Sequence, residues 1–85
     1  MTAELTTRQA RIQNNANRFN FDTVIEKDGD ITYLTVTNPR RPYAEKIAVG
    51  ARINPRTGKE NHFAMVDGKL TPLNRIFIVL QGMAD

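Results

Sequence analysis

The residues best suited to chemistry in this 85-residue chain are basic, and the densest group surrounds residues 54–59, Asn-Pro-Arg-Thr-Gly-Lys. Arg52 precedes this segment and His62 follows it, with few acidic residues nearby to neutralise the charge. Arginine binds phosphates through paired hydrogen bonds, and lysine acts as a point charge. These residue types predict a contact surface for an anionic partner, in which Arg52, Arg56 and Lys59 are the binding residues.

A second basic segment spans residues 38–43, Asn-Pro-Arg-Arg-Pro-Tyr. Its two prolines favour an extended chain that presents Arg40 and Arg41 beside an aromatic neighbour, Tyr43. Arginine stacks on bases as well as binding phosphates, and a tyrosine ring is a stacking platform. The alternative is a solvated loop between two hairpins, with Tyr43 folded back on the core.

Enzyme chemistry finds no support in the residue types present. The chain has no serine and no cysteine, and His62 is its only histidine. Neither a P-loop nor a Gly-x-Gly-x-x-Gly motif occurs, so those routes to nucleotide binding are absent. We therefore expect no enzyme activity, no metal and no cofactor, and we interpret His62 as an exposed polar strand residue.

Residues 52–60, Arg-Ile-Asn-Pro-Arg-Thr-Gly-Lys-Glu, resemble the arm tip of the bacterial histone-like HU and integration-host-factor proteins. In that family an Asn-Pro-x-Thr-Gly segment ends a basic two-stranded arm that enters the DNA minor groove. The resemblance implies DNA contact by this hairpin. It covers nine residues, and the family's two N-terminal dimerising helices and the glycine-phenylalanine segment before the arm have no counterpart here. The same residues also suit a hairpin loop on geometry alone.

The net charge of +3 is unevenly distributed. Residues 38–62 carry six basic and two acidic side chains, whereas residues 19–37 carry one basic and four acidic side chains. A basic middle beside an acidic hairpin predicts an oriented field that steers an anionic partner.

Local patterns predict the elements that position these residues. A helix is expected over about residues 6–18, because Thr6 and Gln9 fit a capping box and Ile12 and Ala16 fall on one apolar stripe. From residue 21 the pattern becomes that of β-hairpins, with Asp28-Gly29 and Asp67-Gly68 as turns. The run 76–80, Ile-Phe-Ile-Val-Leu, is interpreted as a central strand, although a short buried helix has the same pattern.

The segment 45–53 alternates as a half-buried strand, with Ile47 and Val49 on one face and Ala48, Gly50 and Arg52 on the other. Small residues on the second face indicate either a bulge or sharp coiling, or a surface open to a ligand. If the sheet is a meander, the two basic segments lie at opposite ends of this strand. A nucleic acid must then run along it, past Lys46, Gly50 and Arg52, or a dimer must bring the basic ends together.

We predict a single α+β domain over residues 1–85: an N-terminal helix packed on a five- to six-stranded antiparallel sheet. Its hairpins span about residues 21–80, and the sheet could curl into a small SH3-like or OB-like barrel. The apolar runs are too short to span a bilayer, and no signal-peptide core is present, so a cytoplasmic protein is expected. The core candidates are Leu5, Ile12, Phe19, Val24, Leu34, Val36, Ile47, Val49, Phe63, Ile76, Ile78 and Leu80.

Two functions fit this sequence best, and a third, a structural subunit of a larger particle, fits its small core and exposed strand edges. The first is a small non-enzymatic binding domain that contacts phosphates of DNA or RNA. The second is a protein-interaction module or inhibitor, of the kind encoded by phages and mobile elements, that uses the same arginines on an acidic protein surface. Self-association is compatible with either. The residues predicted to bind the partner are Arg40, Arg41, Tyr43, Arg52, Arg56 and Lys59.

Overall fold

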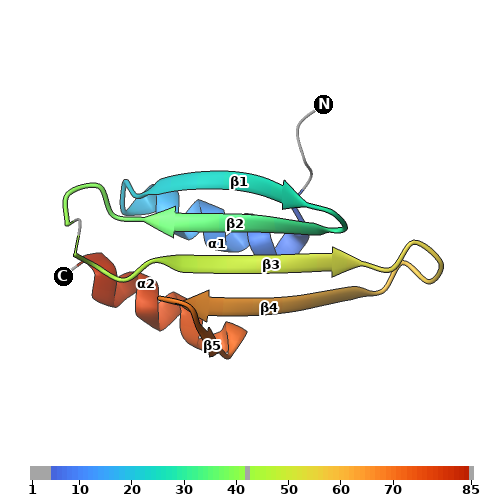
Figure 1. The fold of residues 1–85 in the computed structure, drawn as a ribbon. Helices are drawn as coiled ribbons and strands as arrows, with labels where there is room; N and C mark the ends of the chain where they lie inside the picture. The colour runs from blue at the N-terminus through green and yellow to red at the C-terminus, as the bar shows by residue number, and fades with distance from the viewer. Residues whose placement is uncertain (1–4, 42, 85) are drawn as a thin grey trace.

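The computed structural model describes residues 5–41 and 43–84 as two helices on one antiparallel sheet. In chain order the elements are α1 (Thr7–Arg18), β1 (Asp22–Asp28), β2 (Ile31–Thr37), β3 (Ile47–Ile53), β4 (Glu60–Val66), β5 (Lys69–Thr71), the 3-10 turn η1 (Leu73–Arg75) and α2 (Ile76–Ala84). The strands lie side by side in the order of the chain (Figure 1). The predicted α+β fold is confirmed. The sheet is open, with β1 and β5 at its edges, so a barrel does not form.

Helix α1 begins at the predicted capping box. The hydroxyl of Thr6 accepts a hydrogen bond from the Gln9 backbone N–H, and Gln9 Oε1 accepts one from the Thr6 N–H. Gln9 is fully buried, and its Nε2 donates to the carbonyls of Thr32 and Val49, each at 2.9 Å. The residue that closes the helix N-terminus therefore also fastens the helix to β2 and β3.

The Asp67-Gly68 turn forms as predicted, with positive φ at both residues, 52° and 84°. The β1–β2 turn lies one residue later than predicted. Asp28 pairs with Ile31, so that Gly29 and Asp30 are the central residues. Only Gly29 has a positive φ, 60°, as in a type II′ turn, which places glycine at the first central position.

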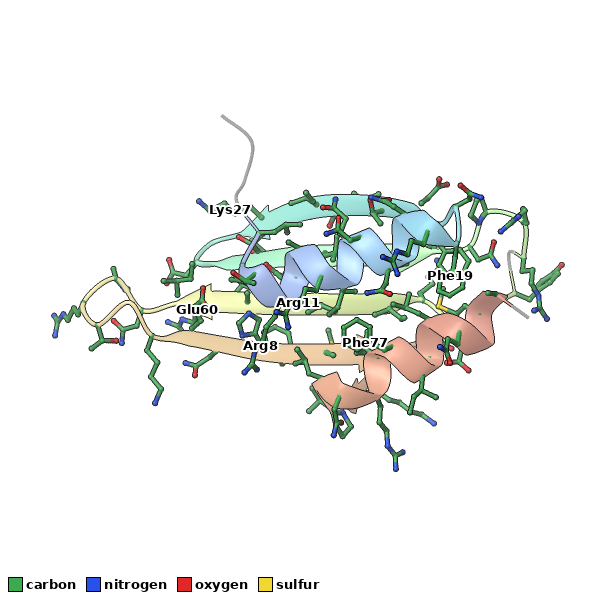
Figure 2. The ribbon with its side chains drawn as sticks, turned by 180° about the vertical axis from the view of Figure 1, so that it is seen from behind. Arg8, Arg11, Phe19, Lys27, Glu60 and Phe77 are labelled. Carbon is green, nitrogen blue, oxygen red and sulfur yellow. The ribbon has the colours of Figure 1, made fainter. Side chains whose placement is uncertain are left out.

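The hydrophobic core lies on one face of the sheet. Both helices cover this face, as Figure 2 shows from behind the view of Figure 1. The strand residues of the core cluster are Leu34, Val36, Ile47, Val49 and Ala64, and its helix residues are Ile12, Ala16, Ile76, Leu80 and Met83. We call this the covered face. The described residues place no element over the opposite, uncovered face.

Residues 76–80 form the start of α2, and the predicted central strand is wrong. Ile76, Leu80 and Met83 are buried at helical spacing, while Ile78 is 68% exposed and is not a core residue. The physical reason is that the buried stripe continues at helical spacing to Met83, beyond the apolar run. A strand over residues 76–80 would not place Met83 in the same row. No helix among the described residues is long and apolar enough to cross a membrane.

Candidate functional site

The uncovered face is organised around β3. Ile47 and Val49 are buried on the covered face, as the sequence predicted, and Ala51 is buried with them, so the alternate residues point the other way. We call the β3 residues Ala48, Gly50 and Arg52, together with Lys46 just before the strand, the β3 track. Its middle is made of small residues, of which Gly50 is buried, and each end carries an exposed cation.

An aromatic pair flanks the middle of the track. The sheet register places Tyr33 on β2 and Phe63 on β4 directly opposite Gly50, one on each side. The two ring centroids are 5.8 Å apart and the ring planes meet at 80°. Edge-to-face contact of this kind is a favoured aromatic geometry. The two rings therefore meet across the glycine.

Gly50 is what allows this contact. A Cβ added there would lie 2.7 Å from both Cε atoms of Phe63 and closer still to Cζ, as expected for an atom above the ring plane. The ring of Phe63 therefore lies flat over the Gly50 backbone. Its outer face is turned away from the sheet, and Phe63 is a partly exposed residue instead of the core residue that the sequence predicted.

Arg52 marks the end of the track next to the β3–β4 hairpin. Its guanidinium lies 3.6 Å from the Asp30 carboxylate, and both side chains are mostly exposed. Here the surface is hollowed into a polar concavity of about 510 Å³, lined by Asp30, Arg52, Asn54, Pro55, Arg56 and Asn61. Exposed ion pairs contribute little to stability, so the Arg52 guanidinium can exchange this partner for another anion.

The loop after Arg52 is held by its own backbone and side chains. Asn54 Oδ1 accepts from the Arg56 N–H at 2.9 Å, and the Asn54 carbonyl accepts from the Gly58 N–H at 2.7 Å. Gly58 adopts the left-handed conformation, with φ 72°, which glycine takes without steric cost. Arg56 and Lys59 are exposed on this loop, which projects beyond the rest of the sheet (Figure 1).

The other end of the track faces the β2–β3 loop. Arg40 donates from Nη2 to the carbonyl of Phe19 at 2.8 Å, beyond the end of α1, so part of its guanidinium is engaged. Arg41 is exposed, and Tyr43 is 100% exposed. The alternative in which Tyr43 folds back on the core is therefore wrong. Pro42 lies outside the described residues.

The structure thus separates the six predicted binding residues into two groups, at opposite ends of β3 (Figure 1). Arg40, Arg41 and Tyr43 lie at one end, whereas Arg52, Arg56 and Lys59 lie at the other. This is the arrangement expected of a meander. Sequence reasoning missed Tyr33 and Phe63, because only the strand register brings residues 30 positions apart to one glycine.

Acidic residues occupy one edge of the same face. Asp22, Glu26 and Asp28 lie opposite Thr37, Tyr33 and Ile31, and so share the uncovered face with them. Lys27, which lies between two of these acids, points to the covered side. The uncovered face therefore runs from an acidic edge at β1 to cations along β3.

His62 lies on the covered face and is not the exposed residue that the sequence suggested. It is partly buried, and its Nε2 lies 2.6 Å from the hydroxyl of Thr6 at the start of α1. Burial lowers the pKa of His62 below its ordinary value, with an opposing effect from Glu60 and a further lowering from Arg8. The ring is therefore a neutral hydrogen-bonding partner of the helix N-terminus, away from the β3 track.

A different basic groove lies between the two helices. Its volume is about 320 Å³, and Arg8, Arg11 and Phe77 line it together with Ile12, Leu73 and Asn74. The three labelled side chains lie on the helix side of the molecule (Figure 2). Arg11 and Phe77 thus supply a cation and an aromatic ring on the side opposite the β3 track.

The described residues contain no group of three or more histidine, cysteine, aspartate or glutamate side chains that could hold a metal ion. No protein-family model, curated protein or solved structure matches the chain.

Proposed function

We propose that the protein binds nucleic acid along the β3 track, with phosphates held at the two basic ends. The observation that carries this proposal is the placement of two exposed cations, Lys46 and Arg52, at opposite ends of the β3 track, on either side of the Phe63 ring. From Lys46 to Arg52 the strand rises by about 20 Å, which is the length of roughly six phosphates on one strand of B-form DNA. The track is thus long enough for several phosphate contacts.

The remaining charges indicate where on the uncovered face the nucleic acid lies. Arg56 and Lys59 extend the basic surface beyond Arg52, and Arg41 with Tyr43 extends it beyond Lys46. Arg40 contributes less, since one of its nitrogens already binds the Phe19 carbonyl. The acids of β1 repel a polyanion, so the strand of nucleic acid lies over β3 and β4.

The test is a titration of fluorescently labelled DNA and RNA with the protein at several salt concentrations. Counterion release predicts that affinity falls as salt rises, with a log–log slope of about −0.7 to −0.9 for each phosphate contact. In the Arg52→Gln and Arg56→Gln double variant we expect weaker binding to every sequence and a slope smaller by about 2. Both side chains are exposed, so the fold is retained.

Arg11→Gln is the matched control, because it removes a cation from the helix side of the molecule. It should leave the affinity and the salt slope near those of the unaltered protein. An absence of binding to any DNA or RNA at low salt contradicts the proposal. Equal losses from the control and from the double variant contradict the assignment to the β3 track.

A protein partner is the second candidate, favoured by apolar side chains on the uncovered face. Leu70 is 78% exposed and Val24 is 50% exposed, and each lies in the row of residues that includes Ala48. Val24 was predicted to be in the core. In this alternative the arginines contact an acidic protein surface, as an interaction module or inhibitor would. Capture of a defined partner that persists after nuclease treatment supports it, and loss of all captured material on nuclease treatment contradicts it.

A further inference from the structure

We infer that the β3 track is built for single-stranded nucleic acid, with a base stacked on Phe63 and Tyr33 beside it. This inference rests on the proposed function and narrows its substrate class. Proteins that bind single strands combine a basic path for the backbone with aromatic rings on which bases stack. The uncovered face has both features, and they meet at Gly50.

The first step is the orientation of Phe63. Its ring lies flat on the backbone of β3, with one side against Gly50 and the other side turned outward. A base needs an accessible ring face of this kind, whereas a ring standing on edge presents only its rim. Tyr33, whose ring plane is at 80° to that of Phe63, stands beside this platform and limits rotation of the Phe63 ring.

The second step is the position of the cations relative to that platform. Arg52 lies two residues from Gly50 along β3, on the same face, and it lines the concavity together with Asn54 and Arg56. A base over Phe63 would therefore place its own backbone beside cationic and amide groups. Charge complementarity selects an anionic strand over an uncharged apolar partner for this surface.

The third step is why the strand is single. Bases in a duplex are stacked on one another and present only their edges to a protein, so an aromatic ring on a flat sheet cannot reach their faces. Phe63 and Tyr33 lie in the sheet itself, without a projecting wedge. The face of Phe63 can stack with a base only where that base is already unpaired.

The experiment compares the protein's affinity for an oligothymidine of about 12 nucleotides, which is within the usual site size, with its affinity for the duplex of that strand and its complement. We expect the single strand to bind at least about tenfold more tightly at equal salt. Phe63→Leu should weaken single-strand binding by about tenfold or more, as expected for loss of one stacked base. Phe77→Leu, which removes an exposed ring from the helix side, should leave it unchanged.

A fluorescence measurement tests the same contact without altering the platform. The chain has two tyrosines and no tryptophan, so that in a Tyr43→Phe variant the only tyrosine is Tyr33. Stacking of bases beside Tyr33 should quench its emission when the single strand is added. Bound single strand without quenching overturns the inference, even if Phe63→Leu does not fold.

The outcomes separate this inference from the proposed function. If duplex and single strand bind equally and Phe63→Leu binds normally, nucleic-acid binding stands and the stacking inference is wrong. If no nucleic acid binds, both are wrong. If the protein binds none and instead sediments as a dimer that Phe63→Leu or Leu70→Ser dissociates, the uncovered face is an interface between copies of the chain.

Discussion

The two faces of the sheet are made by the same strands but differ in what they bury. On the covered face, branched apolar side chains from β2 and β3 meet two helices, and the buried amide of Gln9 has partners for its oxygen and its nitrogen. The uncovered face carries rings, small residues and charges. The difference indicates that stability comes mainly from one face, which leaves the composition of the other free to serve binding.

Truncating a leucine on each face is the strongest test of this comparison. Leu34 is fully buried on the covered face, whereas Leu70 is 78% exposed. Leu34→Ala should lower the free energy of unfolding by about 2–5 kcal/mol, from lost transfer energy and a residual cavity. Leu70→Ala should change it by less than about 0.5 kcal/mol. Urea titration measures both values.

Leu34→Ala should leave nucleic-acid affinity unchanged under conditions where the variant remains folded, because Leu34 does not reach the uncovered face. Comparable destabilisation by the two variants would mean that the uncovered face is buried in the folded protein, against another surface or another copy.

Replacing a glycine on the uncovered face should change the free energy of unfolding by a smaller amount, and the sign of the change should depend on whether the Phe63 ring is present. Gly50 lies within β3 and outside the left-handed region, so alanine is compatible with its backbone. Gly50→Ala should nevertheless destabilise by about 1–3 kcal/mol, because the new methyl group must displace the Phe63 ring. In a Phe63→Ala background the same change should be neutral or stabilising, since alanine is favoured over glycine in strands.

The double-mutant cycle of Gly50→Ala and Phe63→Ala isolates this contact, with an expected coupling of about 1–3 kcal/mol. Additive effects of the two substitutions would show that Phe63 does not lie on Gly50, and would remove the structural basis of the stacking platform.

The smallest effect concerns the pH dependence of the covered face. The lowered pKa of His62 means that the folded protein holds this proton less tightly than the unfolded chain does. The contribution of His62 to the free energy of unfolding is therefore fully present above about pH 6.5, and it decreases as the pH falls toward the lowered pKa of the folded state. Thermal unfolding across this range measures the decrease.

His62→Gln is the control for that measurement, because glutamine can hydrogen-bond the Thr6 hydroxyl but does not titrate. It should remove the part of the pH dependence that lies just below pH 6.5. His62 is the only histidine, so a dependence that persists in the variant would assign the titration to carboxyl groups instead.

The features that could be predicted from the sequence are those with local causes. The capping box of Thr6 and Gln9 and the Asp67-Gly68 turn depend on residues within one or two turns of chain. The alternation along β3 correctly separated its two faces. The separation of the basic residues into two groups followed from that strand and a meander topology.

The errors arose where distant residues decide the outcome. Residues 76–80 form a helix because Met83, outside the apolar run, completes a buried stripe. His62 is partly buried because α1 begins above it, which no pattern around residue 62 indicates. Tyr33 and Phe63 form a pair only through the register of β2, β3 and β4. That register was not available from one sequence.

The flat packing of Phe63 on Gly50 also has an evolutionary consequence. Every amino acid that a single nucleotide change can put in place of glycine carries a Cβ, so no such substitution at position 50 leaves the ring where it is. Position 50 can therefore change freely only after position 63 has lost its aromatic side chain. In descendants of this sequence, we expect these two positions to vary as a pair.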